Sequence, residues 1–549
     1  MAVEKSELAF PKLDAAAIAR LASYGHERRT SAGEILFDVG QANVSVFVVL
    51  EGDIEIVSPS GSGVHVVVVH EPGDFTGEVN LLSGRPSLVR GRTTVPSTLL
   101  EIDRSNLYRI VQADAALSEL FLRAFMLRRA YLVASGTGDV VLIGSNHSAD
   151  TLRLKGFLAR NGHPHTYIDV DRDPDVQHLL DQFHFRLDEI PVLICRGEHV
   201  LRNPSNADAA ACLGLNEEVD EQSVYDVIVA GAGPSGLAAA VYAASEGLRV
   251  LVLESSAPGG QAGSSSRIEN YLGFPTGVSG QELADRALVQ AQKFGAHVNV
   301  ALPATALKCA RRPFVVEMGG GGSVQGRSII VATGAAYRKL PLHNLAHFEG
   351  VGVYYGATFV EAQLCQGENV AIVGGGNSAG QAAVFLSGRV RHLHLLVRGP
   401  GLSDTMSRYL IRRIEETPNI TLLPFTEITA LEGNGRLEGL RWRDSKTGVE
   451  EAHDIQHVFL MTGAAPNAAW LDNCLALDEK GFVKTGSDLS PGDLATAKWP
   501  LPRAPYLLET SLPGVFAVGD VRSGSVKRVA SAVGEGSIAV QLLHRVLAE

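Results

Sequence analysis

The stretch YDVIVAGAGPSGLAAAVYAASEGLRVLVLE, residues 225–254, decides how the C-terminal part of this chain folds. An apolar run of strand length leads into Gly231, Gly233 and Gly236, a helical pattern follows, and a second apolar run ends at Glu254. Glycines at this spacing let the backbone approach a pyrophosphate at a helix N-terminus, and an acid after the second strand suits a ribose diol. We therefore predict a βαβ dinucleotide-binding unit.

A second stretch of the same kind, ENVAIVGGGNSAGQAAVFLSGRVRHLHLLVR, covers residues 368–398. Gly374, Gly376 and Ala379 occupy its small-residue positions, and its second apolar run ends at Arg398 instead of an acid. A guanidinium at this place suits a 2′-phosphate, whereas a carboxylate would repel it. We therefore expect NADPH rather than NADH in this unit, and a merely solvated Arg398 is the alternative interpretation.

Length and composition describe a multidomain α/β protein. At 549 residues the chain exceeds a single core, so three or four domains are expected. Its 58 glycines, 45% hydrophobic residues and 20% charged residues are typical of a soluble globular chain. The net charge of −12, with acidic and basic residues interspersed, gives no reason to expect nucleic acid or an anionic membrane as a partner.

Targeting and redox signals favour the cytoplasm. The N-terminus MAVEKSELAFPKL lacks the basic and apolar regions of a secretory signal, and the longest apolar runs have only strand length. We therefore expect no membrane span, and we expect no metal site. Five cysteines, far apart and without a CxxC pair, are typical of reduced thiols in a cytoplasm.

Two further units precede the dinucleotide stretches. Residues 1–135 combine valine-rich strands and glycine turns, which are typical of a β-roll, with a helical segment over 105–133. Residues 138–215 alternate strands with helices and predict a small α/β domain. The polar segment NEEVDEQS, residues 216–223, is expected to be a linker.

Together, the two dinucleotide stretches resemble the low-molecular-weight thioredoxin reductase family, which is of the class II pyridine nucleotide-disulfide oxidoreductase type. The resemblance covers roughly residues 223–549 and rests on motifs in family order: GGQ at 259–261, RIENYLGFP at 267–275, VATGA at 331–335, MTGAAPN at 461–467, GVFAVGDVR at 514–522 and KRVASAVGEGS at 527–537. It implies a homodimer with an FAD-binding domain over 223–336 and 466–549, and an NAD(P)H-binding domain inserted over 337–465.

The resemblance also implies which residues contact FAD and NADPH. Toward FAD these are Gly231, Gly233, Pro234, Ser235, Gly236, Glu254, Gly260, Gln261, Asn270, Thr333, Gly334, Gly519, Asp520, Lys527, Arg528 and Val529. Toward NADPH they are Gly374, Gly376, Asn377, Ser378, Ala379 and Arg398.

The family's two redox cysteines are missing from the stretch YYGATFVEAQLC, residues 354–365. Alignment on the second glycine loop places Ala357 and Val360 at the cysteine positions, and Glu361 at the position of the acid that serves as proton donor. Neither alanine nor valine can attack a disulfide, so a dithiol relay at this position is excluded. Cys365 is interpreted as a buried small side chain, with a catalytic thiol as the alternative.

The small α/β domain resembles a thioredoxin or glutaredoxin fold over residues 142–195. Ile190–Pro191 stands where that fold has a cis-proline beside its active site. The position of its CxxC reads Ser145-Asn146-His147-Ser148, which contains no sulfur. We therefore expect a redox-inert domain that serves as a docking surface or spacer.

Residues 32–93 resemble the cyclic-nucleotide-binding β-roll. Gly77 and Glu78 match the pair that opens the family's phosphate-binding cassette. The arginine that the family places directly after a proline is replaced, however, because Ser87 follows Pro86.

Two nearby arginines, Arg85 and Arg90, are candidates to replace the missing one. Either could do so only with altered geometry, because a bidentate phosphate contact depends on where the guanidinium is held. Binding of cAMP or cGMP is one interpretation of this unit. A β-roll kept for dimerisation through the helix over 105–133 is the other.

The sequence thus predicts a multidomain protein with a β-roll, a thioredoxin-like α/β domain and two Rossmann-like α/β domains, the second inserted in the first. As its function we predict a cytoplasmic, FAD-dependent NAD(P)H oxidoreductase that passes electrons to a small-molecule or protein acceptor without an internal CxxC dithiol. One alternative is a thioredoxin-disulfide reductase that uses partner-supplied or other cysteines. A second is a redox- or cyclic-nucleotide-responsive sensor or scaffold flavoprotein.

Overall fold

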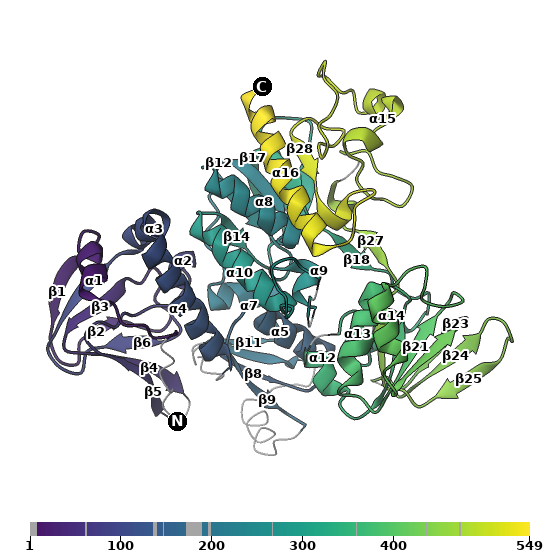
Figure 1. Cartoon of the computed structure of the whole chain (residues 1–549), viewed down its shortest axis with the longest axis horizontal. Coiled ribbons are helices and arrows are strands. Elements are labelled where there is room, and N and C mark those ends of the chain that lie inside the picture. The colour runs from purple at the N-terminus through teal and green to yellow at the C-terminus, as the bar shows by residue number, and fades with distance from the viewer. Residues whose placement is uncertain are drawn as a thin grey trace.

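A computed structural model describes residues 8–60, 63–78, 80–134, 140–146, 148–171, 189–195, 199–265, 267–268, 270–357, 359–434, 436–471 and 474–549. Figure 1 shows the units in which these residues are arranged. We name them the β-roll unit (8–134), the small α/β unit (140–215), the first dinucleotide unit (224–336 with 466–549) and the second dinucleotide unit (338–464).

Two antiparallel sheets form the β-roll unit, in the strand orders β1-β7-β3 and β2-β6-β4-β5. Their β-branched residues fit a pleated surface that is buried on one side. Phe47, Phe75 and Phe121 are among the largest fully buried side chains between the sheets and the helices. The elements are α1 (Ala15–Leu21), β1 (His26–Thr30), β2 (Ile35–Phe37), β3 (Val46–Glu51), β4 (Ile54–Ser60), β5 (Gly63–His70), α2 (Asn80–Ser83), β6 (Arg90–Arg92) and β7 (Ser97–Ile102).

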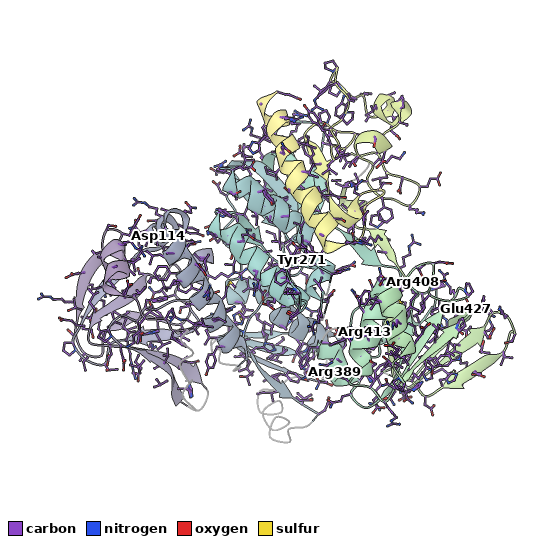
Figure 2. The ribbon with its side chains drawn as sticks, in the orientation of Figure 1. Asp114, Tyr271, Arg389, Arg408, Arg413 and Glu427 are labelled. Carbon is purple, nitrogen blue, oxygen red and sulfur yellow. A yellow bond between two sulfur atoms is a disulfide. The ribbon has the colours of Figure 1, made fainter. Side chains whose placement is uncertain are left out.

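The helix expected over residues 105–133 is instead two helices, α3 (Arg104–Ala113) and α4 (Ala115–Ala134), which meet at Asp114 (Figure 2). The Asp114 backbone is extended, with φ −116° and ψ 102°. Its carboxylate accepts two N–H groups from the first turn of α4, at 3.1 and 3.0 Å. Asp114 therefore caps α4, and the continuous apolar periodicity of the sequence conceals this break.

A four-stranded sheet in the order β11-β10-β8-β9 forms the small α/β unit. The Ile190–Pro191 peptide bond is cis, as its position predicts. Ser148 accepts the Thr151 N–H at 3.3 Å and so caps a helix at the position where a CxxC was missing; His147 lies outside the described residues. The elements are β8 (Val140–Gly144), α5 (Ala149–Arg160), β9 (Thr166–Asp169), β10 (Val192–Cys195), β11 (His199–Arg202) and α7 (Asn206–Leu213).

A seven-stranded sheet organises the first dinucleotide unit, in the order β14-β13-β12-β17-β16-β15 with β28 paired to β17. Its parallel strands are buried on both faces, which accounts for their continuous Val, Ile and Leu runs. Helices α8 and α16 pack on the sheet and against each other through residues such as Ala239 and Leu543. The elements are β12 (Val224–Ala230), α8 (Pro234–Ser245), β13 (Val250–Leu253), α9 (Gly260–Gly263), α10 (Gly280–Lys293), β14 (His297–Asn299), β15 (Ala304–Lys308), β16 (Phe314–Met318), β17 (Ser323–Val331), η2 (Ala469–Leu471), η3 (Gly486–Asp488), α15 (Pro491–Thr496), β28 (Val515–Ala517), η4 (Gly519–Val521) and α16 (Val529–Ala548).

The chain leaves the first sheet after β17, builds the second dinucleotide unit and returns at β28. The second unit has a parallel sheet in the order β19-β26-β20-β21-β22 and a separate antiparallel sheet, β23-β24-β25. An antiparallel ribbon of β18 and β27 joins the two units. The elements are β18 (Ala335–Tyr337), α11 (Leu345–Phe348), β19 (Val353–Tyr354), α12 (Phe359–Leu364), β20 (Asn369–Val373), α13 (Asn377–Ser387), β21 (His392–Val397), α14 (Arg408–Glu415), β22 (Ile420–Pro424), β23 (Thr426–Glu432), β24 (Gly439–Asp444), β25 (Glu450–His453), β26 (His457–Leu460) and β27 (Ala464–Pro466).

The expectation of reduced cysteines is wrong for four of the five. Cys195, at the end of β10, forms a disulfide with Cys212 of α7, and Cys309, after β15, forms one with Cys474, after η2. The paired residues are 17 and 165 positions apart, so their proximity depends on the fold and is not visible from their spacing. Cys365 is free and buried. The cysteines therefore do not support a reducing compartment.

The segment expected to be a linker, residues 216–223, is fixed to the first dinucleotide unit at its start. Asn216 and Val300 exchange two hydrogen bonds of 2.8 Å each, one through each group of the Asn216 amide. The Glu217 carbonyl accepts the Asn299 amide at 3.1 Å. These bonds hold the small α/β unit close to the first sheet.

Among the helices that the structure describes, none has both the length and the hydrophobicity required to cross a bilayer.

Candidate functional site

The first glycine loop is packed so tightly that two of its positions admit only glycine. Gly231 has a φ of 103°, and a Cβ there would lie 2.4 Å from the Ala332 carbonyl oxygen. A Cβ on Gly236 would lie 1.9 Å from the Gly231 carbonyl oxygen. These contacts bring β12, the loop and the end of β17 together.

Gly233 faces open space instead. The nearest atom to a Cβ built there is the Gly260 Cα, at 4.0 Å. Gly233 precedes α8 without any side-chain cap, and Pro234 takes the first helical position, while Ser235 is buried beneath the loop. The uncapped N–H groups of this turn and the space before them fit the pyrophosphate of a dinucleotide.

Glu254 is 7% exposed at the end of β13, beside the same loop. One carboxylate oxygen accepts the Ala232 N–H at 2.7 Å. The other accepts the Ser256 N–H at 2.9 Å and the Ser255 hydroxyl at 3.3 Å. A carboxylate offers about four acceptor positions, so Glu254 positions the loop and keeps a lone pair for a ribose hydroxyl.

Arg160, which sequence reasoning missed, supports this loop from the small α/β unit. It ends α5, and its Nη2 donates to the Gly260 carbonyl at 3.0 Å and to the Ala257 carbonyl at 3.5 Å. Burial lowers the pKa of Arg160, and the negative charges of Glu254 and Glu361 oppose that shift. No local signal could reveal this contact, because the bonded residues are 100 positions apart.

The C-terminal part of the first unit completes the site through η4 and α16. A Cβ on Gly519 would lie 2.5 Å from the Ser235 Oγ, so η4 abuts the start of α8. The Gly519 N–H donates at 2.7 Å to Glu535, a second residue that the sequence analysis did not single out. Burial raises the pKa of Asp520 beside them, and the positive charge of Lys527 opposes this shift.

The start of α16 lies at the same cluster. Lys527 and Arg528 are exposed, and Arg528 precedes the helix without a side-chain cap for the N–H groups of its first turn. A Cβ on Gly536 would lie 2.3 Å from the Ser235 carbonyl oxygen, which shows that α16 packs directly on α8. The two halves of the first unit therefore meet at one site.

Thr333 and Asn467 connect the two chain segments that pass between the dinucleotide units. The Thr333 hydroxyl donates to the Asn467 carbonyl at 2.7 Å, and the Asn467 amide donates to the Thr333 carbonyl at 2.9 Å. The Asn467 N–H donates to the Gly334 carbonyl at 3.0 Å. Gln261 donates to the Ala335 carbonyl, which links the ribbon to the loop beneath Arg160.

Among the described residues, Asn270 forms no hydrogen bond to this cluster. It is exposed on the loop after α9, next to Tyr271, which Figure 2 marks beside α10.

The second glycine loop repeats the packing of the first. Gly374 has a φ of 146°, and a Cβ there would lie 2.3 Å from the Met461 carbonyl oxygen. Gly376 precedes α13 without a side-chain cap, and the nearest atom to a Cβ built on it is the Thr405 carbonyl oxygen, at 4.0 Å. This loop therefore fits a second pyrophosphate.

The first turn of α13 is held by the loop before α14. Asn377 accepts the Ser407 N–H at 2.7 Å, Ala379 is fully buried, and Ser378 is exposed. Arg408 follows as the first residue of α14 and is exposed (Figure 2). Sequence reasoning missed this arginine, although the segment SRYLIRR is visibly basic.

Arg398 follows β21 directly and is exposed. It thus stands after the second strand of its unit, where Glu254 stands in the first. The second unit therefore has two solvent-accessible cations, Arg398 and Arg408, in the segment that follows its nucleotide loop.

The position of the missing cysteines lies at α12. Ala357, just before this helix, is 9% exposed and packs in the apolar core of the second unit. Cys365, just after it, is fully buried, and burial raises the pKa of its thiol to about 12. Cys365 is therefore a protonated thiol at neutral pH. The Val360 side chain lies outside the described residues.

Glu361 lies on α12, where that helix faces the first unit. A Cβ on Gly356 would lie 3.9 Å from the Ser264 Oγ, which places this stretch beside α9. Burial raises the pKa of Tyr354, and the charge of Glu361 adds to that shift. Glu361 also acts electrostatically on Arg160, so its carboxylate is close to the support of the first loop.

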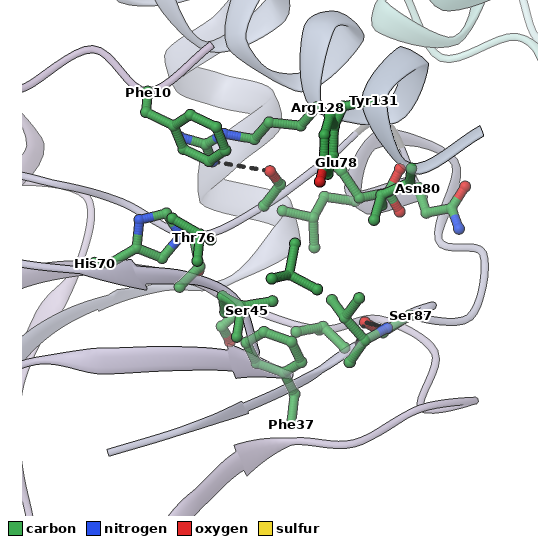
Figure 3. A pocket seen from close by; sticks show the side chains of 18 of the residues that line it. Phe10, Phe37, Ser45, His70, Thr76, Glu78, Asn80, Ser87, Arg128 and Tyr131 are labelled. Carbon is green, nitrogen blue, oxygen red and sulfur yellow. Dashed lines mark hydrogen bonds between the residues drawn. The ribbon is translucent and has the colours of Figure 1, made fainter. Parts of the chain in front are cut away.

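The β-roll unit contains a pocket between its sheets and α4 (Figure 3), which brings together all four expected ligand contacts: Gly77, Glu78, Arg85 and Ser87. Arg90, the other candidate to replace the missing arginine, forms two hydrogen bonds of 2.8 Å with Asp38 and does not line the pocket.

Comparison with known proteins places these features in a family. Residues 225–536 match the family described as pyridine nucleotide-disulphide oxidoreductase, and residues 27–114 match the cyclic nucleotide-binding domain. The chain is 34% identical over 329 residues to a thioredoxin reductase of Mycolicibacterium smegmatis, which covers 60% of this chain and 98% of the relative. It is 28% identical over 332 residues to a thioredoxin reductase of Bacillus subtilis, which covers 60% of this chain and 97% of that relative.

A solved structure also shows similarity to a thioredoxin reductase. The crystal structure of T. acidophilum thioredoxin reductase matches with a TM-score of 0.53 and 28% identity, over 59% of this chain and 99% of that one. The family match includes both glycine loops and the ribbon between the units. The resemblance and the Rossmann-type fold are thus confirmed. The chain belongs to the pyridine nucleotide-disulphide oxidoreductase family and is an NAD(P)H-dependent flavin oxidoreductase of the thioredoxin reductase type.

Proposed function

We propose that this protein passes electrons from NADPH through FAD to an acceptor without an internal pair of redox cysteines. The observation that carries the proposal is the chemistry at α12, where Ala357 and Val360 replace the two sulfurs of the family. The neighbouring sulfur, Cys365, is a buried thiol whose raised pKa disfavours the reactive thiolate.

We assign FAD to the first unit and NADPH to the second. Glu254 and the uncapped start of α8 support the first assignment, because they suit a ribose and a pyrophosphate. The exposed cations Arg398 and Arg408 support the second, because a 2′-phosphate requires positive charge. Bound FAD supplies the two-electron chemistry that the polypeptide lacks. The chain positions the two dinucleotides.

The two disulfides do not take the place of the missing pair. Lys308, just before Cys309, pairs with Val315, and Val315 pairs with Gln325 near the start of β17. Gln325 is six residues before the end of β17, where the glycine loop contacts Ala332, so roughly 20 Å of strand separates this disulfide from the cofactor edge. The other disulfide belongs to the core of the small α/β unit.

An anaerobic titration with NADPH tests the proposal. The oxidised flavin absorbance should be lost after one equivalent of NADPH per FAD, because no dithiol takes up a second electron pair. A requirement for two equivalents, or a long-wavelength thiolate–flavin charge-transfer band, would place a sulfur pair in the path and contradict the proposal.

Cysteine variants sharpen this experiment. The double substitution Cys309→Ser with Cys474→Ser and the single substitution Cys365→Ala should leave the stoichiometry and the rate of flavin reduction unchanged. A changed stoichiometry in either variant would identify the sulfur that participates.

A second candidate function is thioredoxin-disulfide reduction with cysteines supplied by the partner, which the names of the similar proteins favour. Turnover of NADPH with oxidised thioredoxin, followed by a thiol reagent, should be negligible under our proposal and rapid under this one. A flavin that NADPH does not reduce would instead support a sensor or scaffold.

We also expect the small α/β unit to be a redox-inert thioredoxin-like domain, the protein to be a homodimer and its compartment to be the cytoplasm. Light scattering coupled to size exclusion tests the dimer, and cell fractionation with an antibody against the protein tests the compartment. A monomer, or recovery of the protein outside the cytoplasmic fraction, would contradict these two expectations.

A further inference from the structure

We propose that the pocket of the β-roll unit binds a small apolar carboxylate, held by Arg128, instead of a cyclic nucleotide. The proposal goes beyond the electron-transfer function and does not depend on it. Arg128 lies on α4 and is 6% exposed. Its position in the apolar segment FLRAFMLRRAYL gives no local signal of a functional role.

Hydrogen bonds and ring contacts hold the Arg128 guanidinium in place, but they do not use all of its N–H donors. Its Nε donates to the Ala9 carbonyl at 2.9 Å, and its Nη1 donates to the carbonyls of Phe75 and Gly77 at 3.0 and 2.9 Å. The rings of Phe10 and Phe75 lie 4.9 and 4.5 Å from its central carbon. Figure 3 shows this side chain extending along the pocket to Phe10.

The remaining nitrogen, Arg128 Nη2, is buried and has no hydrogen-bond partner among the described residues. Arg128 also forms no ion pair within the part of the chain that the structure describes. A buried cation with unused N–H donors is costly unless an acceptor satisfies it. Because Arg128 lines the pocket, a ligand anion is positioned to be that acceptor.

The charges around Arg128 leave the site positive. Burial lowers the pKa of Arg128 only to about 9, and the nearby charge of Asp74 opposes this shift, so the side chain is cationic at neutral pH. Glu78 lines the pocket too, but the Arg129 guanidinium lies 3.5 Å from its carboxylate. Arg85 is a further cation in the lining.

The rest of the lining is apolar. Phe37, Val44, Ile56, Val67 and Leu132 are buried side chains of the pocket wall, and Figure 3 shows Phe37 on the side away from Arg128. An apolar body with one anionic end matches this arrangement, because hydrocarbon surface gains free energy on burial here and the carboxylate meets the guanidinium.

Two groups that would hold a cyclic nucleotide are missing or engaged elsewhere. Ser87, at the family's arginine position, donates its hydroxyl to the Val89 carbonyl at 2.8 Å. Arg85 is anchored through its Nε to the Leu215 carbonyl at 2.8 Å, while its Nη2 has no hydrogen-bond partner among the described residues. Glu78, the expected ribose contact, faces Arg129.

Calorimetric titration of the full-length flavoprotein tests the proposal with matched probes. Hexanoate and benzoate are compared with hexanamide and benzamide, which have the same shape without the charge, and with cAMP and cGMP. At least one acid should bind roughly tenfold or more tightly than its amide, because hydrogen bonds to charged groups are the strong ones. Equal binding of acid and amide, binding of cyclic nucleotides in place of the acids, or no binding of any probe would overturn the proposal.

Two substitutions on α4 locate the anion contact. Arg128→Gln should weaken acid binding roughly tenfold and remove the preference over the amide. Arg123→Gln is the matched control on the same helix, because Arg123 is exposed and pairs with Glu119. Far-ultraviolet circular dichroism and the melting temperature verify that each variant is folded. If Arg128→Gln does not fold, the comparison of acid with amide on the unmodified protein still decides the question. Unchanged acid binding by a folded Arg128→Gln variant would contradict the proposal.

Discussion

The two dinucleotide loops close in the same way, Gly231 against the Ala332 carbonyl and Gly374 against the Met461 carbonyl. They differ in what surrounds them. Glu254 of the first is 7% exposed and bonded to its own loop, whereas Arg398 of the second is open to solvent.

Other elements also cover the first loop, namely α5 of the small α/β unit through Arg160 and α16 of the first dinucleotide unit itself through Gly536. The exposed basic residues beside the second loop, Arg398 and Arg408, have no such cover. We infer that the first unit is built to retain its dinucleotide through many turnovers and the second to exchange one in each turnover.

The largest effect is expected at Gly236. In Gly236→Ala the new Cβ would lie 1.9 Å from a backbone oxygen that cannot move alone, so we expect a loss of about 3 kcal/mol or more in the free energy of unfolding, and a protein purified without flavin. Gly380→Ala, in α13 after the second loop, is the matched control, because Ala379 already occupies the position that corresponds to Gly236. Its Cβ would meet the flexible Met406 side chain, and helix propensity compensates, so the change should stay within about 1 kcal/mol. Flavin content and urea unfolding measure both, and equal losses would refute the comparison.

Arg398 should decide which nicotinamide dinucleotide the second unit prefers. Arg398→Ala should raise the Kd for NADPH roughly tenfold to a hundredfold and leave that for NADH nearly unchanged, because a charge-assisted contact to the 2′-phosphate is lost. Arg441→Ala, an exposed arginine of the same unit that pairs with Glu432, is the control. Titration under anaerobic conditions measures both constants. An equal change for both dinucleotides would mean that Arg398 does not contact the 2′-phosphate.

Arg160 should contribute to retention in the first unit. Arg160→Met removes the hydrogen bonds to the carbonyls of Gly260 and Ala257, so we expect the Kd for FAD to rise roughly fivefold. The fluorescence of released flavin on dilution measures this constant without any turnover. Arg202→Met, on an exposed arginine of the same unit that pairs with Glu189, should leave the Kd unchanged. Equal flavin release from both variants would show that Arg160 does not contribute to FAD retention.

Acid should destabilise the second unit at a higher pH than the first. This is the smallest of the four predicted effects. Burial lowers the pKa of His457 and of His394 to about 4 from the ordinary value of 6.5. The unfolded chain therefore binds protons that the folded unit does not, and stability that is complete above about pH 6.5 falls as the pH decreases toward 4. The first unit's histidines, His297 and His544, are more exposed to solvent.

Hydrogen exchange at pH 7 and pH 5 measures this difference. The second unit should lose protection at pH 5, and His457→Gln should restore part of it. His343→Gln, at an exposed position, should have no effect. Uniform loss across both units would show that these two histidines do not control the acid response.

The parts of the fold that were predictable from sequence depend on local chemistry. The glycine at position 231 adopts a φ that other residues avoid, and the cis bond of Ile190–Pro191 is a property of proline, so both are visible in a short stretch. The helix break at Asp114 also depends on a short stretch. The apolar periodicity continues across it, however, and predicted one helix where two exist.

What the sequence could not reveal depends on contacts between distant segments. Arg160 contacts a loop 100 residues away, and the two disulfides join cysteines with no motif spacing. Arg128 was hidden for a different reason, because an arginine in an apolar helix resembles any surface arginine until its burial is known. Distance and burial are properties of the tertiary structure, so the candidate site was predictable only where a motif brings its residues together in the chain.

The bond between Cys309 and Cys474 encloses residues 310–473, and the whole of the inserted second unit lies within that segment. The polypeptide is therefore a covalent ring at this point, closed on the side of the first sheet away from the glycine loop. A protease cut in the inserted unit would leave a single cross-linked molecule, and the two chain halves that form the first dinucleotide unit would stay joined. The inserted unit could therefore unfold while the two halves of the first unit remain covalently linked.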